Sequence, residues 1–574
     1  MPAITLHNDD PNVRLQLAEQ WESDGIFYAR VCVTCDEAVV MKPFSLSFSL
    51  PAADMYSIWS PQTDANGMRK LGPNWNKKTT QSRFAHGLPL HAVLAVGGHN
   101  RLTVAVSDVK TPLTIGTGVS EERAELECKI TFFTQLTAPL RQYGAVVRID
   151  TRDIPFYESI PDVVSWWENS FGLKPEAAPE AAKQPVNSLW YSLHQKLYAE
   201  DVMLQCRLSA PYGLKTVILD DGWQTEDNNR GYAYCGDWEL ATAKIPDMAR
   251  LVKALHGLGM KVMLWYSVPY VGIHSKSYPR FEGKYLSFDA RRGTACLDPR
   301  YLCVRRYLAE QYERAVRDWD LDGLKLDFVN AFRLTPETPV HDPQRDIQSL
   351  EEAIEQLLLD VKTRLQRLKP DILIEFRQGY IGPAMRCYGN MLRAGDCPRD
   401  ALCNKTAVLD LRLTSGRTPI HSDMLMWHPQ EPVESAALQL ASVLFSVPQI
   451  SLRLDQISGE QKQMLRFYLD FWQENRELLL EGKLALYSPE AFYSKATATL
   501  SDRELTVLYT DTTVVKGADR TTVVNCGPER RVYLEGFSGQ GYKIVDCMGT
   551  ERDSGVLTEL CALTLPGAGV LFTE

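Results

Sequence analysis

The sequence lacks the features that mark nucleic-acid-binding and membrane-spanning proteins. Its 574 residues include 62 lysines and arginines against 72 aspartates and glutamates, a formal net charge of −10, with no basic run that could follow a phosphate backbone. No stretch reaches about 18 consecutive apolar residues, and the first residues lack a basic start followed by an apolar core. We therefore expect no nucleic acid partner, no membrane span and a cytoplasmic location.

Metal and cofactor motifs are also missing. The 13 cysteines follow no framework, and their odd number in a long chain favours reduced thiols. Cys32 and Cys35 form a lone C-x-x-C in a segment that alternates like a strand, which favours a structural role. His421 and His428 have no ligand partners at metal spacing, and neither a nucleotide-binding glycine loop nor a G-x-S-x-G elbow occurs. We predict no metal and no other cofactor.

The composition is that of a globular protein with several cores. Hydrophobic residues make up 45% and charged residues 23% of the chain, and its length predicts more than one domain. Residues 1–172 and 479–574 contain short alternating runs separated by turns, which indicates an antiparallel β-sandwich at each end. Residues 173–184, rich in Pro, Ala and Glu, read as a linker.

Residues 185–478 predict a (β/α)₈ barrel, because short apolar strands alternate there with long amphipathic segments. The stripe of apolar residues from Gln348 to Leu368 is typical of a helix that packs on a barrel. The candidate strands are Ser188–Tyr191, Thr216–Asp220, Lys261–Tyr266, Gly323–Asp327, Ile372–Arg377, Met391–Ala394, Pro419–Ser422 and Gln449–Leu452.

Charged residues close several of these strands, where the active site of such a barrel lies. Lys325 and Asp327 share one face of their strand, and Glu375 and Arg377 share one face of the next, because side chains alternate along a strand. Burying such charges is costly unless they are paired or used. We expect these four side chains to point inward and converge.

Two further strand ends carry carboxylates. Asp220 and Asp221 precede a turn glycine and Trp223. Such carboxylates can accept hydrogen bonds from sugar hydroxyls while the indole ring stacks on the apolar face of the sugar. Asp396 follows a short strand beside a glycine. Glycosidases need two carboxylates about the scissile bond, and Asp327 and Asp396 fit these roles. The full set predicted to bind substrate is Asp220, Asp221, Trp223, Trp265, Lys325, Glu375, Arg377, Arg393 and Asp423.

Three of these segments resemble motifs of glycoside hydrolase family 36, the melibiases, in a clan with families 27 and 31. Residues 219–224 are similar to its second-strand motif and residues 322–327 to its nucleophile strand. Residues 393–400 resemble its acid/base strand, in a form closer to raffinose synthase-like members. The resemblance covers residues 185–475 and implies a retaining α-galactosidase acting on a glycoside or oligosaccharide.

It also implies residue roles: Asp327 as nucleophile, Asp396 as general acid/base, Lys325 as a hydroxyl ligand, and Asp220 or Asp221 as the ligand of the sugar's far hydroxyls. In that family the N-terminal sandwich also lends an aromatic to the site, for which Trp59 and Trp75 are candidates. Homo-oligomerisation is possible.

The fifth strand departs from the melibiase pattern. Where bacterial melibiases carry a Cys and a Ser-Gly-Gly-Gly-Arg loop, residues 375–386 are closer to the loop of family 31 α-glucosidases and α-xylosidases. Another sugar, including glucose, xylose or an acidic sugar, therefore stays open as the substrate. A transglycosylase of the raffinose synthase sort and a silent sugar-binding barrel are further alternatives.

Overall fold

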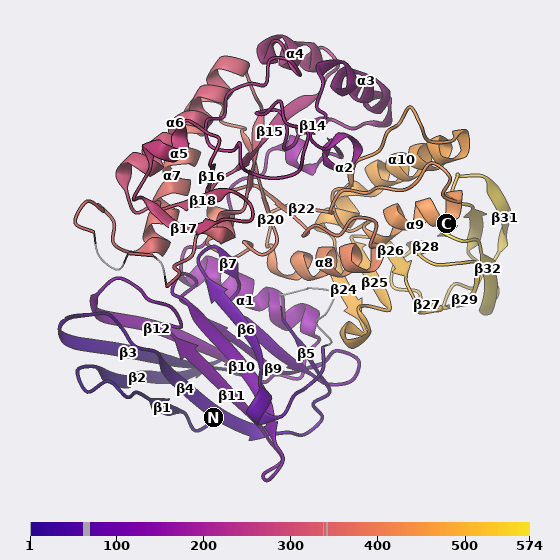
Figure 1. Ribbon diagram of the computed structural model, residues 1–574. Coiled ribbons are helices and arrows are strands. Elements are labelled where there is room, and N and C mark those ends of the chain that lie inside the picture. Colours follow the sequence, from indigo (N-terminus) through magenta and orange to yellow (C-terminus); the bar gives the residue numbers. More distant parts are fainter. Residues whose placement is uncertain (1, 61–68, 337, 340–341, 574) are drawn as a thin grey trace.

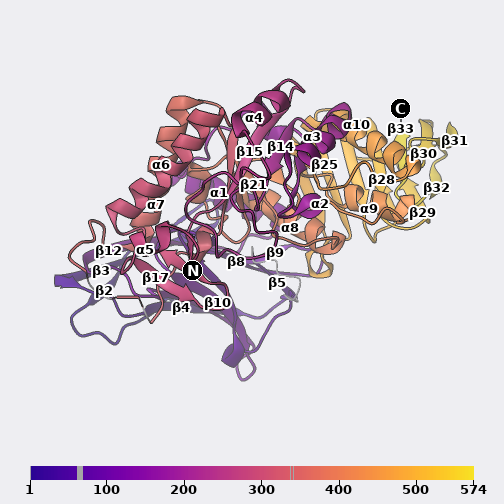
Figure 2. The same cartoon turned by 45° about the horizontal axis from the view of Figure 1, so that its top comes forward.

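The chain folds as two β-sandwiches on different sides of a central barrel (Figure 1). The computed structural model describes residues 2–60, 69–336, 338–339 and 342–573. A view turned by 45° again shows the C-terminal sandwich beyond one side of the barrel and the N-terminal sandwich beneath another (Figure 2). This architecture confirms the predicted fold class.

The N-terminal sandwich consists of two six-stranded antiparallel sheets around one apolar core. The first sheet has the order β1 (Thr5–His7), β4 (Phe44–Pro51), β11 (Glu125–Phe132), β10 (Leu113–Ser120), β6 (Lys78–Arg83) and β7 (His86–Gly87). The second has the order β2 (Arg14–Ser23), β3 (Ile26–Val39), β12 (Leu140–Asp150), β9 (Asn100–Val106), β8 (Leu90–Leu94) and β5 (Ser57–Trp59).

The barrel is a ring of eight parallel strands. Their order is β13 (Val186–Ser188), β14 (Thr216–Leu219), β15 (Lys261–Ser267), β19 (Gly323–Asp327), β20 (Leu373–Arg377), β21 (Met391–Arg393), β22 (Ile420–His421) and β23 (Gln449–Ile450). A parallel bridge between His421 and Val447 joins the last two strands and closes the ring. Each strand lies within a few residues of its predicted position.

Helices cover the outside of the ring, with one exception. The outer helices are α3 (Ala199–Ser209), α4 (Met248–His256), α6 (Leu302–Trp319), α7 (Leu350–Leu368), α8 (Ala401–Thr414), α9 (Val433–Ser442) and α10 (Gly459–Glu481). Only a 3-10 turn, η5 (Met385–Cys387), separates β20 from β21. There α1 (Phe156–Ser170) packs against α8, and its Glu168 pairs with Arg386 of η5 at 2.9 Å. A helix from outside the barrel segment therefore covers this side.

The segment expected as a linker is instead packed under the barrel. Glu180–Lys183 forms the 3-10 turn η2, and Ala182 is fully buried in a cluster with Val186, Ile218 and other residues from the amino ends of the strands. The Ala182 carbonyl oxygen also contacts Nε2 of His421 at 2.8 Å. Burial of this kind fixes the segment against the barrel floor and gives His421 a structural partner.

A second sandwich follows α10. Its larger sheet has the order β24 (Lys483–Tyr487), β25 (Lys495–Leu500), β26 (Arg503–Leu508), β28 (Arg520–Asn525), β33 (Val570–Thr573), β30 (Gly541–Val545) and β31 (Glu551–Val556). The smaller sheet has β27 (Thr513–Val515), β29 (Arg530–Glu535) and β32 (Leu560–Leu565). Two of its strand pairs, β26 with β28 and β27 with β29, are parallel within an otherwise antiparallel sandwich. The predicted boundary at residues 478 and 479 falls inside α10, which packs on β25 and β26.

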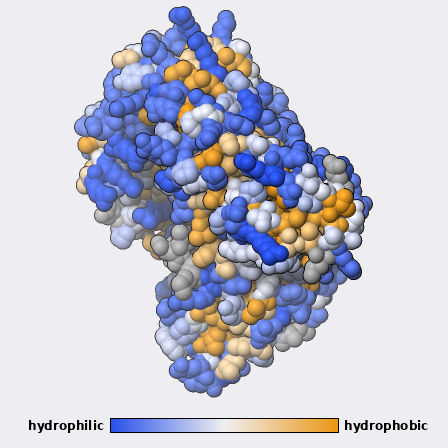
Figure 3. Space-filling model, turned by 90° about the vertical axis from the view of Figure 1, so that its right-hand side faces the viewer, coloured by the Kyte–Doolittle hydropathy of each residue, from blue (hydrophilic) through white to orange (hydrophobic). Residues whose placement is uncertain are grey.

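Viewed from the side of the C-terminal sandwich, the surface is mostly hydrophilic, with apolar residues in small scattered patches (Figure 3). Within the described residues, no helix has both the length and the apolar character needed to cross a bilayer.

Candidate active site

The charged strand-end residues converge at the carboxyl ends of β14, β19, β20 and β21. Parallel pairing places Lys325 beside Glu375, and Arg377 beside Arg393, at matching levels of neighbouring strands. The alternate residues Leu324, Leu326, Ile374 and Phe376 lie in the apolar core instead. Strand alternation therefore directs the charges into the ring, as the sequence predicts.

Asp327 ends β19 and is 7% exposed. Its Oδ1 accepts hydrogen bonds from Arg377 Nε at 2.5 Å and from the Phe328 amide at 2.8 Å, and its Oδ2 accepts one from Trp265 Nε1 at 3.1 Å. Burial opposes ionisation, but the charges of Arg377 and then Lys325 outweigh it and hold the pKa of Asp327 below its usual value. This carboxylate is ionised and fixed in direction, as a nucleophile requires.

Arg393 forms the centre of a cluster of three carboxylates. Its guanidinium donates to Asp396 Oδ1 at 2.8 Å and to Asp423, and its Nε lies 3.5 Å from Glu375 Oε1. Burial raises the pKa values of Asp423 and Glu375 despite this cation. The Asp396 side chain is 51% exposed. Desolvation acts to raise the pKa of Asp396, but the charge of Arg393, and to a smaller extent that of Arg377, outweighs it and lowers this pKa. Asp396 is therefore accessible and ionised.

The two catalytic candidates interact electrostatically, because the charge of Asp396 acts to raise the pKa of Asp327 and Arg377 lowers the pKa of both. Asp327 ends β19, and Asp396 lies in the loop after β21. Arg377 thus lies within electrostatic reach of both carboxylates.

The β14 end supplies a second buried pair. Lys325 Nζ donates to Asp220 Oδ2 at 2.6 Å, and this partner raises the pKa of Lys325 although burial acts to lower it. Asp221 accepts amide hydrogen bonds from Gln195 at 3.0 Å and Gln224 at 2.7 Å. Burial, opposed in part by the Gln224 bond and reinforced by Asp220, raises the pKa of Asp221 to about 6.

Trp223 and Trp265 have different surroundings. Trp265 is 2% exposed and contacts Asp327 through its indole N–H. Trp223 is fully buried, donates to the Trp265 carbonyl oxygen at 2.8 Å and packs against Trp238 and Tyr266. Trp223 therefore supports Trp265 from within the core. The expected stacking of Trp223 on a sugar is wrong, because the ring is not exposed to a ligand.

The N-terminal sandwich contributes a hairpin to the rim of the site. The turn between β6 and β7 lies where the sandwich meets the barrel (Figure 1). The Gly87 amide donates to the Gly379 carbonyl oxygen at 2.8 Å, beyond β20. Arg83 donates to the carbonyl oxygens of Phe332 at 2.8 Å and Asn330 at 2.5 Å, beyond β19. This hairpin therefore braces the loops that follow Asp327 and Arg377.

Neither tryptophan expected from that sandwich reaches the site. Trp59 is fully buried, and its indole N–H donates to Asp410 Oδ1 of α8 at 2.9 Å. Arg69 of the N-terminal sandwich and Tyr493, which follows β24, also bind Asp410, so Trp59 belongs to a junction of all three parts. Trp75 is 68% exposed in the 3-10 turn η1 (Asn74–Asn76) beside β10.

Several polar residues that sequence reasoning missed support this site. Tyr191 donates to Asp423 at 2.9 Å, Gln449 to Glu375 at 2.5 Å, and Tyr380 to the Leu326 carbonyl oxygen at 2.9 Å, with Asp327 Oδ1 3.3 Å from the same hydroxyl. Gln449 belongs to the predicted eighth strand, so inward alternation could have identified it. Tyr191, expected at the end of the first strand, lies instead in the short helix α2 (Trp190–Leu193), and Tyr380 lies in the loop after β20, so strand alternation does not indicate the direction of either side chain.

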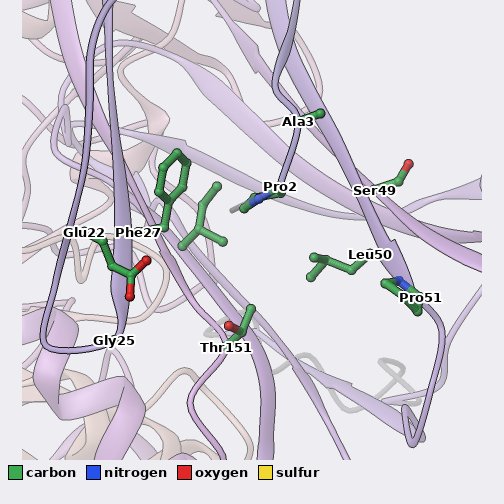
Figure 4. Close-up of a pocket in the computed structure, with 10 residues that line it drawn as sticks. Pro2, Ala3, Glu22, Gly25, Phe27, Ser49, Leu50, Pro51 and Thr151 are labelled. Atoms are coloured by element: carbon green, nitrogen blue, oxygen red, sulfur yellow. The ribbon is translucent and has the colours of Figure 1, made fainter.

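A separate hollow of about 430 Å³ is lined by residues of the N-terminal sandwich (Figure 4). Its lining includes Phe27 and Leu50, and Glu22 is its one carboxylate among the described residues. It cannot supply the pair of carboxylates that the strand ends provide.

Comparisons with known proteins find a family model and relatives that match part of this chain. Residues 185–379 match the family model described as Melibiase. The chain is 34% identical over 136 residues to an A type blood α-D-galactosamine galactosaminidase of Flavonifractor plautii, covering 20% of this chain and 12% of that protein. It is 28% identical over 124 residues to the α-galactosidase AgaA of Geobacillus stearothermophilus, covering 19% of this chain and 17% of AgaA. These alignments thus span less than a fifth of each relative.

The structural likeness is broader than the sequence likeness. The crystal structure of AgaA, a family 36 α-galactosidase, superposes with a TM-score of 0.66 at 17% identity, covering 98% of this chain and 81% of that one. Structures of AgaA variants with stachyose and with raffinose each give a TM-score of 0.64, at 15% and 16% identity, covering 100% of this chain and 87% of theirs. The three-part fold is therefore shared along the whole chain.

Proposed function

We propose that this chain, which carries the melibiase domain of a glycoside hydrolase within the family 36 fold, is a retaining α-glycosidase that acts on terminal α-galactosides. The observation that carries the proposal is the convergence of Asp327 and Asp396 at the barrel strand ends, with Arg377 in electrostatic reach of both. Buried charge at this density is costly in a structural barrel and useful in a catalytic one.

In the first step, Asp327 attacks the anomeric carbon while Asp396 protonates the departing glycosidic oxygen, so that a glycosyl ester of Asp327 and a free aglycone form. In the second step, Asp396 takes a proton from water, which attacks the same carbon and releases Asp327. Two inversions retain the α configuration. The bonds from Trp265 and Arg377 fix the Asp327 carboxylate in direction before attack.

Asp396 must gain a proton before it acts as an acid, and its ion pair with Arg393 opposes this in the free enzyme. A bound glycoside would cover the exposed half of Asp396 and so favour the neutral carboxyl group. Arg393 retains Asp423 and Glu375 as partners when Asp396 becomes neutral. The cluster therefore allows protonation without leaving a buried cation unpaired.

The sugar would be held by Asp220, Asp221 and Lys325, which lie together at the β14 and β19 ends. Charged hydrogen-bond partners suit the several hydroxyls of one terminal sugar. Support for galactose comes from the melibiase match and from AgaA, whose variants are bound to stachyose and raffinose. A family 31-like preference for glucose, xylose or an acidic sugar, and transfer to a sugar acceptor, remain the alternatives.

A second candidate substrate is an α-linked amino sugar. Six carboxylates of the site face four cations, so the pocket carries an excess of acidic groups. They are Asp220, Asp221, Asp327, Glu375, Asp396 and Asp423 against Lys244, Lys325, Arg377 and Arg393. An ammonium group on the sugar would offset part of this excess. The galactosaminidase relative supports the same candidate.

One experiment tests both candidates. The purified chain is incubated with the 4-nitrophenyl α-glycosides of galactose, galactosamine, N-acetylgalactosamine, glucose and xylose, and the first anomer released is followed by proton NMR. We expect α-anomer first, and faster hydrolysis of galactoside or galactosaminide than of the glucoside or xyloside. Initial release of the β-anomer would reject the retaining mechanism. Transfer is separated from hydrolysis by the products formed with excess sugar acceptor.

We further propose an oligosaccharide or glycoside substrate, a homo-oligomeric state and a cytoplasmic location, and the stachyose and raffinose bound to AgaA variants support the substrate. Size-exclusion chromatography with light scattering would determine the oligomeric state.

A further inference from the structure

Three half-buried aromatic rings form a surface beside Asp327. The rings of Tyr232 and Phe328 lie 5.1 Å apart, those of Tyr232 and Tyr270 5.6 Å, and those of Tyr270 and Phe328 5.2 Å. Behind them, Trp265 stacks on Tyr232 at 6.3 Å and donates to Asp327. We call Tyr232, Tyr270 and Phe328 the aromatic platform.

Backbone contacts hold this platform in place. Tyr232 lies in the loop after β14, and Tyr270 begins β16 (Tyr270–Gly272), which with β18 (Thr294–Leu297) and β17 (Tyr285–Asp289) forms a small sheet inserted after β15. The Gly272 amide donates to the Cys235 carbonyl oxygen at 2.8 Å, and the His274 amide to that of Ala233 at 2.9 Å. A side chain at Gly272 would lie 2.1 Å from the Ala233 backbone, so this close approach requires glycine.

Phe328 is held in an unusual conformation. Its φ of 62° lies in the left-handed region, which costs a residue with a Cβ atom about 1–2 kcal/mol. Its amide donates to Asp327 and its ring lies 5.1 Å from the Arg377 guanidinium. The chain thus accepts local strain to place this ring immediately beside the proposed nucleophile.

Both tyrosines of the platform lie within electrostatic reach of Asp327. Burial, and then the charge of Asp327, raises the pKa of Tyr232. Burial also raises the pKa of Tyr270, whose electrostatic neighbours include both Asp327 and the exposed Arg292. No hydrogen bond joins either tyrosine hydroxyl to another described residue. Both hydroxyls are neutral, and the rings present apolar faces within a site otherwise formed by charged groups.

Building on the proposed function, we propose that the aromatic platform is a subsite for the leaving group, and that it takes an aryl aglycone or the apolar face of an aglycone sugar. The sugar that is cleaved must place its anomeric carbon at Asp327, among the charged strand-end residues. Tyr232, in the loop after β14, and Tyr270, in the inserted sheet, follow those strand ends, where the rest of the substrate would extend. Aromatic rings bind the C–H faces of sugars and aryl rings without requiring a particular pattern of hydroxyls.

The test compares two substrates that differ only in the leaving group. The constant kcat/KM is measured for 4-nitrophenyl and methyl α-galactoside, or for the same pair on whichever sugar the panel identifies. We expect Tyr232→Ala and Tyr270→Ala to lower the value for the aryl glycoside about threefold to tenfold, the range of one aromatic contact. The methyl glycoside and inhibition by the free sugar should change less than about twofold, because they do not reach the platform.

Tyr234→Ala is the matched control, because Tyr234 is on the same loop but is 43% exposed and packs on His274. It should leave both substrates unchanged. Tyr232→Phe, which keeps the ring, should retain the preference for the aryl glycoside. This variant keeps the proposal testable if the alanine variant fails to fold. Equal loss on both glycosides, or no loss on either, would overturn the subsite and leave the glycosidase proposal standing. Should the wild type cleave no glycoside, the proposed function fails, and equilibrium binding of the same substrate pair then tests the platform alone.

Discussion

Arg377 should determine the pH below which this enzyme loses activity. The Arg377 guanidinium donates to Asp327 at 2.5 Å, and the two side chains are 17% and 10% exposed. As the proposed nucleophile, Asp327 must be ionised, and its pKa lies below the usual value because Arg377 and Lys325 outweigh burial. Activity is therefore present above that pKa and is lost as the pH falls through it. Without Arg377 the pKa of Asp327 rises, and the acid limb of the profile moves to higher pH.

The size of this effect follows from the geometry. Two unit charges roughly 4 Å apart attract by about 4 kcal/mol at an effective dielectric constant of 20, whereas a tenfold change in protonation costs about 1.4 kcal/mol. For Arg377→Met, the ratio of kcat/KM at pH 7 to that at pH 4.5 should grow by at least about tenfold. The constant kcat/KM is the proper observable because its pH dependence reports groups of the free enzyme.

The controls are Arg377→Lys, which keeps the charge, and Arg520→Met, which removes an exposed cation paired with Asp502 in the C-terminal sandwich. The lysine variant should keep most of the acid limb, and the remote variant all of it. Refutation would be a uniform fall in kcat/KM at every pH for Arg377→Met, because Arg377 would then act on the substrate alone.

The other predictions concern three aspartates. Asp396→Ala should slow the hydrolysis of glycosides with poor leaving groups about 10²- to 10⁴-fold. The first step on activated aryl glycosides should be spared, and added azide should restore their turnover. Equal loss of activity on both classes of substrate, without rescue by azide, would contradict the acid/base role. Asp221→Asn should cost about 1.5–3 kcal/mol in kcat/KM. Burial raises the pKa of Asp221 to about 6, so the wild type loses stability as the pH rises and this carboxyl group ionises, whereas the Asn variant does not. The Tm of the variant minus that of the wild type should therefore increase from pH 4.5 to 7.5. A difference that does not depend on pH would contradict this. Asp410→Ala leaves the buried Arg69 cation without its carboxylate partner, so it should lower the free energy of unfolding in urea by about 3–5 kcal/mol. The control Asp502→Ala, which removes an exposed ion pair, should lower it by about 1 kcal/mol or less, and equal losses in the two variants would contradict a stabilising role of the junction.

Local patterns were sufficient to predict the barrel strands and the direction of their charged residues. Alternation within a strand places Lys325 and Asp327 on one face, and the parallel ring then brings Glu375 and Arg377 beside them. The same reasoning did not distinguish Trp223 from Trp265, because both follow or end apolar strands. Only packing showed that Trp223 lies behind Trp265, in contact with Trp238 and the barrel core.

Loops and long-range contacts escaped prediction for a related reason. Tyr232 lies 13 residues beyond the end of β14 at Leu219, and only the contacts of its loop with the inserted sheet place it near Asp327. The segment at residues 173–184 has the composition of a flexible linker, yet the barrel floor offers Ala182 an apolar cluster. Composition reports what a segment does alone, whereas its final conformation depends on the surface it meets.

The sequence by itself determined the three-part architecture, the order of the barrel strands and the candidate pair Asp327 and Asp396, because periodicity and strand ends are local properties that every residue carries along the chain. Only the tertiary structure decided that Arg393 joins three carboxylates, that the hairpin at Gly87 replaces the expected tryptophans at the rim, and that Arg377 binds Asp327 directly. These contacts join residues of different strands, loops or domains. Their energies depend on burial and on distances between side chains, which arise only when the ring closes and removes those charges from water.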